Sequence, residues 1–382
     1  LKIILIPNGK GYFIKSPSIV INKLHLPANT INPIDSLSSV DSEMDSDMID
    51  HFSQETVETV VAKSLALNSG RFKEFREIVP RSVSILPIAK GCQAKCSFCF
   101  SHSSVSEDTK QLKLSTEYVE DVLKTAKSRG AERAVITGGG EPTLLPHSRL
   151  LDYISLCKKY YDKVVLISNG YVLSNNNVDE ETRLSKMLDL QEAGLSVLSI
   201  SRHGIDETTN ANIMNLKTMA DRIAKTYRIN KSLFPDLKLR WVTVLQKGGV
   251  DSEETLVKYL DWVVATEVDQ VCFKELYVAV SEESVYYDSK YNRYSRQNQI
   301  PLDMVTSYLT KNGSKIVSTL PWGSPVHEFI HKGRRLQIAC YTEPSLFWER
   351  TTGVCRSWNI MADRKVYVSL EDSSSDISSF LV

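Results

Sequence analysis

The sequence lacks three features that would direct it to a membrane, to secretion or to a polyanion. It has no uninterrupted apolar run of about 18 residues, which argues against a transmembrane helix. The first residues, LKIILIPNGKGYF, lack the basic start, long apolar centre and cleavage site of a signal peptide. Net charge is also absent, because 46 Lys and Arg balance 46 Asp and Glu. We therefore expect a cytoplasmic protein that binds neither membrane nor nucleic acid as its main activity.

The cysteines do not have the even spacing of a secreted disulfide framework. There are seven in 382 residues, an odd number, and three of them crowd into GCQAKCSFCFS. Such crowding in a chain of this length is typical of a metal site in a reducing compartment. The acidic stretch at residues 36–50 is not a calcium site, because Ser46 and Phe52 replace the glycine and glutamate of an EF-hand loop.

The chain divides into three parts by pattern. Residues 1–80 predict an α+β extension, with a hairpin around Asn8 and Gly9 and a helix over 55–67. Residues 81–280 alternate six β-branched runs with helical stretches, which predicts an α/β fold with a parallel sheet. Six units are too few for a closed eight-unit barrel, so we expect a partial (β/α)6 TIM-like barrel. Residues 281–382 lose this rhythm and predict a C-terminal cap with a disordered end.

The first predicted helix has complete start and stop signals. Ser115 can cap it, Glu117 suits its first turn, and Gly130 can end it. Its apolar face consists of Val119, Val122, Leu123 and Ala126.

Cys92, Cys96 and Cys99 follow the first predicted strand, at the end where barrel active sites lie. Thiolates this close together repel one another unless a cation holds them. A structural zinc site usually has four protein ligands, and no second cysteine pair is near. A [4Fe–4S] cubane has four irons, so three cysteines would leave one iron open to a substrate or cofactor.

The loop GCQAKCSFCF resembles the signature of radical S-adenosylmethionine (radical SAM) enzymes, with Phe98 as the aromatic before the third cysteine. This resemblance covers about residues 81–280. It implies a [4Fe–4S] cluster on Cys92, Cys96 and Cys99, with S-adenosylmethionine chelating the open iron. Reduction of the cluster then cleaves the sulfonium and yields a 5′-deoxyadenosyl radical that abstracts hydrogen from substrate.

Three further motifs fit this resemblance. TGGGEPTLL follows the second predicted strand and lacks the lysine of a phosphate loop. It is similar to the family motif that contacts the amino group of S-adenosylmethionine, which implies this role for Gly139, Gly140, Glu141 and Pro142. By the same resemblance, ribose contacts fall to Ser168 and Asn169, and to Ser199 or Ser201 after the fourth strand. Arg202 would bind the methionyl carboxylate, although a surface salt bridge remains an alternative for it; His203 we interpret as a plain loop residue.

The tail from Val354 resembles the SPASM/twitch and molybdenum-cofactor branch of the family, where a cysteine-rich region binds an auxiliary cluster. Cys340 and Cys355 are the two cysteines here. Ser357 or Trp358, and likewise Ser369, stand where further cysteines would be expected. A cap without a cluster is therefore favoured over an auxiliary cluster. Tyrosines 286, 287, 291 and 294, with Arg293 and Arg296, line a substrate channel or form an exposed helix.

The favoured function is radical modification of a ribosomally synthesised precursor peptide (RiPP) by excision, epimerisation or crosslinking. Residues 1–80 would form a leader-peptide-binding unit or a lid, 81–280 the radical SAM barrel, and 281–382 a twitch-like extension. The family implies an electron donor such as flavodoxin or ferredoxin. The alternatives are a radical SAM enzyme for a small metabolite or nucleoside, a non-catalytic iron–sulfur scaffold, and a zinc-binding interaction module. No catalytic residue can be assigned from the sequence.

Overall fold

The computed structural model describes residues 72–381 except 103, 106–109, 280–281 and 321–323, together with the backbone of three strands near the N-terminus. These strands are β1 (Ile4–Pro7), β2 (Tyr12–Lys15) and β3 (Val20–Leu24), and they pair antiparallel in that order. This pairing agrees with the expected hairpin, whose turn residues Asn8 and Gly9 lie outside the described residues. The linker at 36–50 and the helix expected at 55–67 lie outside the described residues, as does most of the proposed leader-binding unit.

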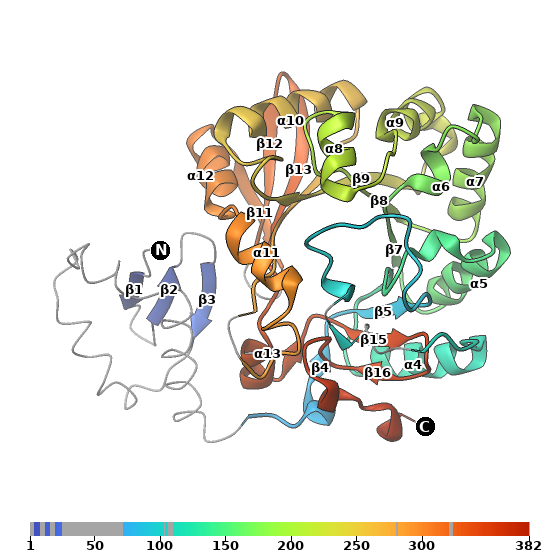
Figure 1. Cartoon of the computed structure of the whole chain (residues 1–382), viewed down its shortest axis with the longest axis vertical. Helices are drawn as coiled ribbons and strands as arrows, with labels where there is room; N and C mark the ends of the chain where they lie inside the picture. The colour runs from blue at the N-terminus through green and yellow to red at the C-terminus, as the bar shows by residue number, and fades with distance from the viewer. Residues whose placement is uncertain are drawn as a thin grey trace.

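A curved sheet of eleven strands forms the main body (Figure 1). Its centre consists of six consecutive parallel strands, so the predicted partial (β/α)6 TIM-like barrel is confirmed. These strands are β5 (Val83–Leu86), β6 (Arg133–Ile136), β7 (Lys163–Ser168), β8 (Val197–Ser201), β9 (Lys238–Leu245) and β10 (Gln270–Glu275).

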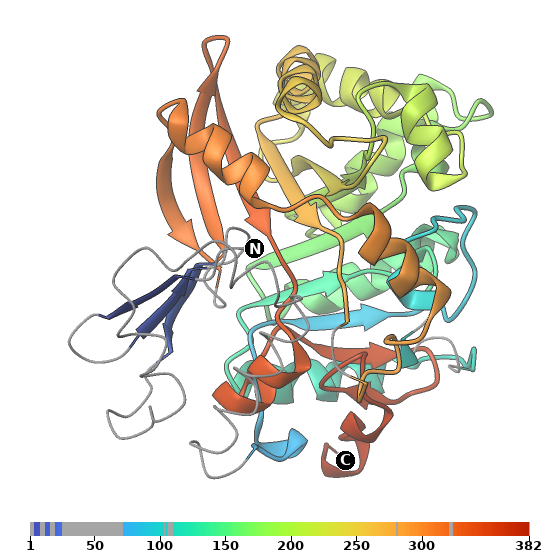
Figure 2. The same ribbon diagram turned by 60° about the vertical axis from the view of Figure 1, so that its left-hand side comes forward.

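Helices cover the outer face of this sheet (Figures 1 and 2). They are α4 (Thr116–Ser128), α5 (His147–Lys158), α6 (Tyr171–Ser174), α7 (Glu180–Glu192), α8 (Glu207–Met214), α9 (Ala220–Ile229) and α10 (Glu253–Thr266). The signals predicted for α4 are confirmed: the Ser115 side chain accepts from the Tyr118 amide, and Gly130 follows the helix at a φ of 106°. The predicted apolar face of α4 is buried.

The C-terminal part adds strands to both edges of the central sheet. β13 (Arg334–Tyr341) pairs parallel with β10, and β15 (Trp358–Met361) pairs parallel with β5. The remaining elements of this part are α11 (Lys290–Asn298), α12 (Asp303–Lys311), β11 (Lys315–Thr319), β12 (Pro325–His331), α13 (Leu346–Thr352), β14 (Val354–Cys355) and β16 (Val366–Tyr367). β14 pairs with β4 (Val79–Pro80) just before β5. The segment between β13 and β15 therefore connects the two edges of the open barrel.

The prediction of a disordered end is wrong for the described residues of the tail. Two short 3-10 helices form at Ser373–Ser375 and Ser378–Phe380. Ser375 is fully buried and its hydroxyl bonds the backbone of Ser369, while Ile377 is 2% exposed. Low-complexity serine sequence folds here because the hydroxyls satisfy turn backbone groups and one apolar side chain anchors the turn.

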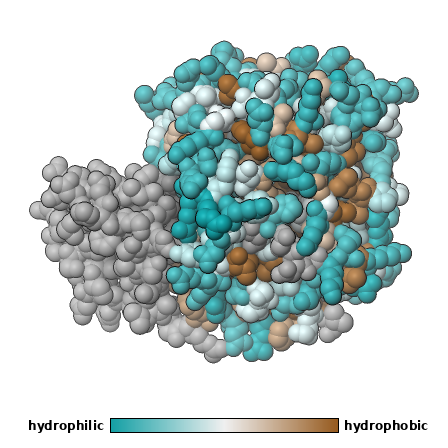
Figure 3. Space-filling view, viewed as in Figure 1, coloured by the Kyte–Doolittle hydropathy of each residue, from teal (hydrophilic) through white to brown (hydrophobic). Residues whose placement is uncertain are grey.

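Apolar side chains fill the layer between sheet and helices and continue into β15 and the tail. On the face seen in Figure 3, hydrophobic residues form small separate groups within a mainly hydrophilic surface. Among the described residues, no helix is both long enough and apolar enough to span a bilayer.

Trp358 tests whether β15 is an integral part of the barrel core. Its ring is 1% exposed, and its Nε1 donates to the Ile78 carbonyl at 3.3 Å. Trp358→Ala should reduce the free energy of unfolding by about 3–5 kcal/mol, because a large cavity opens in the core. Leu112→Ala, at a side chain 46% exposed, should change it by less than about 0.5 kcal/mol. Urea denaturation of both variants measures this, and equal small effects would contradict the placement.

Candidate functional site

The three-cysteine loop lies at the carboxyl end of β5 and is fixed by backbone contacts. The Gly140 amide donates to the Ile88 carbonyl and the Glu141 amide to the Gly91 carbonyl, both at 2.7 Å. On the other side, the Lys95 amide donates to the Met214 carbonyl at the end of α8 at 2.9 Å. The loop is therefore held between the turn after β6 and the end of α8.

The thiols of Cys92, Cys96 and Cys99 are half-buried and close enough to influence one another. Burial raises the pKa of Cys96 to about 12, and the neighbouring Cys99 and Cys92 add to this effect. Burial also raises the pKa of Cys92. In the described part of the chain, no three His, Cys, Asp or Glu side chains lie close enough together to form a metal-ligand set. Three thiols on one short loop suit a metal group, because a bound cation would favour their thiolate forms.

The turn after β6 approaches the cysteine loop so closely that only glycine fits. A Cβ at Gly140 would lie 2.0 Å from the Gly91 carbonyl oxygen, and one at Gly139 would lie 2.6 Å from the Ile88 oxygen. Pro142 then starts a 3-10 helix, Pro142–Leu144, for which Glu141 is the cap. The glycines of the GGGEP motif are thus required by packing between the two loops.

Glu141 is 4% exposed, and both of its carboxylate oxygens accept hydrogen bonds from protein donors. Its Oε1 accepts from the Thr143 amide at 3.1 Å, from the Thr143 hydroxyl at 2.6 Å and from the Ser168 hydroxyl at 2.7 Å. Its Oε2 accepts from the Asn169 amide at 2.8 Å. Glu141 therefore ties the turn after β6 to the end of β7.

Asn169 extends this network to the cysteine loop. Its Nδ2 donates to the Gln93 Oε1 at 3.0 Å and lies 3.7 Å from the Cys92 sulfur. The structure thus brings together the first cysteine, the GGGEP turn, Ser168 and Asn169, which the sequence had placed after three separate strands.

The three candidates at the end of β8 do not share one environment. Ser199 is 1% exposed with its hydroxyl unpaired, and Ser201 is half-buried on the same side of the strand. Arg202 points toward α8 and α10 instead. Its Nη1 lies 2.8 Å from a Glu207 carboxylate oxygen, without hydrogen-bond alignment, and its guanidinium lies 4.6 Å from the centre of the Trp262 ring. Arg202 is thus a buried side chain, not part of a surface salt bridge.

His203 lies in the loop after β8, as interpreted from the sequence, and the structure adds that it is buried. Its Nδ1 accepts from the Val244 amide at 3.0 Å, and its ring meets the edge of Phe98 at 5.2 Å. Burial, assisted by Arg202 and Lys274, lowers the pKa of His203 to about 3. The residue is therefore neutral near pH 7 and links the cysteine loop to β9.

Aromatic residues of α11 and its preceding loop lie near the cysteine loop. Phe100 packs against Tyr277 and Tyr286 at 5.5 and 5.1 Å. Burial raises the pKa of Tyr294, and Cys96 adds to this effect, which places the phenol within electrostatic range of the thiol. Part of the predicted tyrosine set thus borders the cysteine loop.

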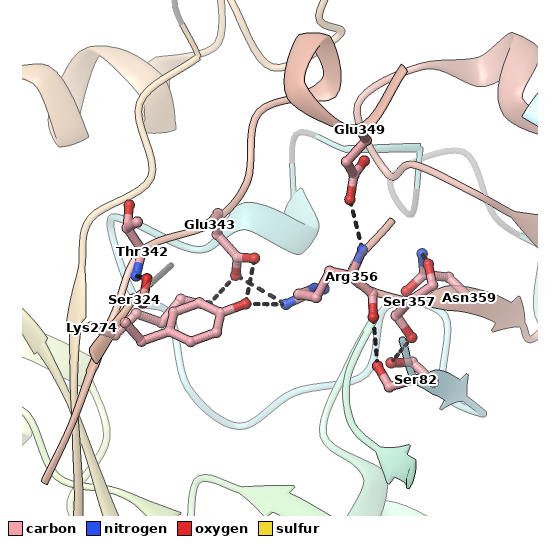
Figure 4. Close-up of polar contacts among 11 residues, drawn as sticks. Ser82, Lys274, Ser324, Thr342, Glu343, Glu349, Arg356, Ser357 and Asn359 are labelled. Carbon is pink, nitrogen blue, oxygen red and sulfur yellow. Dashed lines mark hydrogen bonds and ion pairs between the residues drawn. The ribbon is translucent and has the colours of Figure 1, made fainter. Parts of the chain in front are cut away.

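A polar cluster that was not expected from the sequence lies on the inner face of the sheet. It consists of Lys274, Glu343 and Arg356 (Figure 4), together with Tyr341, and is called the inner-face cluster. Glu343 pairs with Lys274 and, at 3.0 Å, with Arg356. Tyr341 donates to Glu343 at 2.7 Å and accepts from Arg356 at 3.2 Å. Only Lys274 had a sequence signal, its place at the end of the sixth strand.

Cys340 and Cys355, considered for an auxiliary cluster, are both fully buried in the apolar core. Burial raises the pKa of each thiol above its ordinary value. No group of three His, Cys, Asp or Glu residues suited to a metal surrounds them in the described part of the chain.

The fold and the loop together define an open α/β barrel with a three-thiol site at the carboxyl ends of its strands. Residues 86–261 match the family model of the Radical SAM superfamily. This part of the chain is therefore similar to radical SAM domains, a family whose enzymes use a [4Fe–4S] cluster and S-adenosylmethionine.

Two GTP 3′,8-cyclases of Helicobacter pylori are similar to this chain. The protein of strain HPAG1 is 28% identical over 172 residues, covering 44% of this chain and 48% of that protein. The protein of strain J99 is 30% identical over 168 residues, covering 44% and 47%. The chain thus spans about half the length of the curated relatives it matches.

Among solved structures, Streptococcus suis SuiB bound to the precursor peptide SuiA has a TM-score of 0.50 at 16% identity. The likeness covers 91% of this chain and 74% of that one, and it supports the fold.

Gly140 offers a test of the loop packing that does not depend on turnover. Gly140→Ala should prevent the two loops from meeting and abolish iron incorporation on anaerobic reconstitution. Gly91→Ala is the matched control, because its Cβ would meet nothing closer than 3.3 Å. Iron and sulfide content per chain measures this, and a fully loaded Gly140→Ala variant would contradict the close approach.

His203 predicts a pH dependence of stability. Its folded-state pKa of about 3 is below the ordinary 6.5, so the unfolded chain binds the proton more tightly. Stability should therefore fall as pH drops below the ordinary pKa, by about 1.4 kcal/mol per pH unit. His203→Gln should remove this contribution, which is about 2 kcal/mol between about pH 6.5 and 5. Urea unfolding of both proteins at the two pH values measures this difference. An equal loss of stability in the parent and in His203→Gln would contradict it.

Proposed function

We propose that this protein cleaves S-adenosylmethionine reductively and uses the resulting radical to modify a ribosomally synthesised precursor peptide. The observation that carries the proposal is the joining of Cys92, Glu141 and Asn169 in one hydrogen-bonded site at the carboxyl ends of β5, β6 and β7. When bound, the [4Fe–4S] cluster and S-adenosylmethionine supply a 5′-deoxyadenosyl radical for hydrogen abstraction.

The residues of the chain bind and orient these groups. Cys92, Cys96 and Cys99 are proposed as cluster ligands. Gly139, Gly140, Glu141 and Pro142 shape the turn beside the cluster, and Ser168, Asn169, Ser199 and Ser201 offer polar groups for the cofactor. Glu141 also positions this turn through its four hydrogen bonds, and its Oε2, which accepts only one of them, is proposed to face the cofactor amine. Arg202 lies beside Glu207, so we propose that it anchors α8, with a contact to the methionyl carboxylate as the alternative role.

The peptide substrate rests on two observations. SuiB, whose fold this chain shares over most of its length, was solved with a precursor peptide bound. Aromatic residues of α11 and its preceding loop border the cysteine loop, as an extended peptide would require. The N-terminal strands would belong to a leader-binding unit, and a flavodoxin or ferredoxin would supply electrons.

A second candidate is a nucleotide substrate. It is favoured by the similarity of the barrel to two GTP 3′,8-cyclases, whose names state a reaction on GTP. The proposed peptide and this nucleotide are distinguished by which of them stimulates turnover.

Formation of 5′-deoxyadenosine tests the proposal. Anaerobically reconstituted protein with S-adenosylmethionine and dithionite should form it, and Cys96→Ala should reduce it to background. Cys157→Ala is the matched control, because this thiol is buried in α5 within the apolar core. Mass spectrometry measures the product. Equal formation by parent and Cys96→Ala, or none with reduced iron present, would overturn the proposed function.

The substrate is tested by adding a candidate precursor peptide, or GTP, to the same reaction. The peptide should increase 5′-deoxyadenosine formation and change mass itself. Stimulation by GTP alone would replace the peptide with the nucleotide candidate.

A further inference from the structure

The inner-face cluster unites side chains from both edges of the open barrel. Lys274 lies on β10 and Tyr341 on β13, while Glu343 and Arg356 belong to the segment that connects β13 with β15 (Figure 4). None of these four residues is a proposed ligand of the iron–sulfur cluster or a proposed cofactor-binding residue.

Positive charge exceeds negative charge in this cluster. Lys274 and Arg356 share a single carboxylate, that of Glu343. Burial opposes ionisation of Glu343, but Arg356 and Lys274 outweigh it and lower its pKa to about 2. The nearby Glu349 accepts from the Arg356 amide at 2.9 Å, but burial raises its pKa well above the usual range.

Both cations retain access to solvent and donors for a further partner. Lys274 keeps 31% and Arg356 33% of side-chain surface accessible, although both lie inside the barrel wall. Among the described residues, Arg356 uses only its Nη1 side for Tyr341 and Glu343. An ammonium has three N–H donors and a guanidinium five, so several remain for an anion.

The inner-face cluster is also coupled to the cysteine loop. Lys274 acts on His203, whose pKa it helps to lower, and the His203 ring contacts Phe98, the residue before Cys99. An electrostatic effect on His203 and one ring contact thus relate Lys274 to the loop that would hold the iron–sulfur cluster.

We propose that Lys274 and Arg356 form a subsite for a carboxylate of the substrate. The inference rests on the proposed function in taking the inner face as the side on which the substrate lies. Glu343 holds the two cations apart and in place, and a substrate carboxylate completes the charge balance with the donors that remain. The carboxylate belongs to an acidic side chain or to the C-terminus of the peptide.

The test uses two small probes of equal size in calorimetric titrations of the full reconstituted chain. N-acetylglutamate α-amide should bind at least about tenfold more tightly than N-acetylglutamine α-amide, because a charged hydrogen bond is lost with the amide. N-acetylalanine, which carries only an α-carboxylate, identifies the C-terminal source if it binds better than the glutamate probe.

Variants that should change the affinity for the probe in opposite directions distinguish a binding role from a structural role. Arg356→Gln and Lys274→Gln should each weaken binding of the glutamate probe by about tenfold. Glu343→Gln should strengthen it, because removing the internal carboxylate leaves both cations to the probe. Lys258→Gln, an exposed pair partner of Glu254 on α10, should leave it unchanged. Thermal unfolding identifies any variant that has lost its fold. If Arg356→Gln is such a variant, Lys274→Gln is used in its place.

Equal binding of the glutamate and glutamine probes to the parent would overturn the subsite. So would weakening of the glutamate probe by Glu343→Gln to the same extent as by Arg356→Gln. These outcomes do not depend on turnover. Selective probe binding without 5′-deoxyadenosine formation would overturn the proposed function and leave the subsite standing. 5′-Deoxyadenosine formation without selective probe binding would overturn the subsite and leave the proposed function standing.

Discussion

The buried carboxylate of Glu141 is the constraint on which the candidate site depends. It accepts four hydrogen bonds from Thr143, Ser168 and Asn169, and so joins the loops after β6 and β7. The adjacent backbone, through Gly140 and Glu141, holds the loop after β5. A carboxylate so placed is costly to bury unless it is hydrogen-bonded, and here both oxygens have protein donors. The three loops that present cysteine, glycine and amide groups are therefore tied to one another.

A second constraint keeps the open barrel together. The parallel sheet ends at β13 on one side and at β15 beyond β5 on the other, and the connecting segment carries Glu343 and Arg356 between them. Strand pairing does not close this opening, and charged side chains contact one another there instead. The same opening leaves the cations accessible from inside, and a substrate could complete their coordination. Closure of the fold and recognition of substrate would thus use the same residues.

Much of this arrangement could be predicted from the sequence. The six strands and α4 follow from local periodicity, and the cysteine loop and GGGEP turn carry motifs at strand ends. Alternation along β8 also holds a signal that was not used: Ser199 and Ser201 share one face, so Arg202 must take the other. The inner-face cluster could not be predicted, because Lys274 lies 69 residues from Glu343 and only the three-dimensional closure brings them together. The ordered tail was missed because serine-rich composition hides its capping bonds.

The central claim is that the cysteine loop holds a cluster with one iron open to S-adenosylmethionine. Electron paramagnetic resonance of the anaerobically reconstituted, dithionite-reduced protein tests it directly. The account predicts the signal of a reduced [4Fe–4S] cluster whose g-values change when S-adenosylmethionine is added. A signal that S-adenosylmethionine leaves unchanged, or a protein that takes up zinc and no iron, would contradict it.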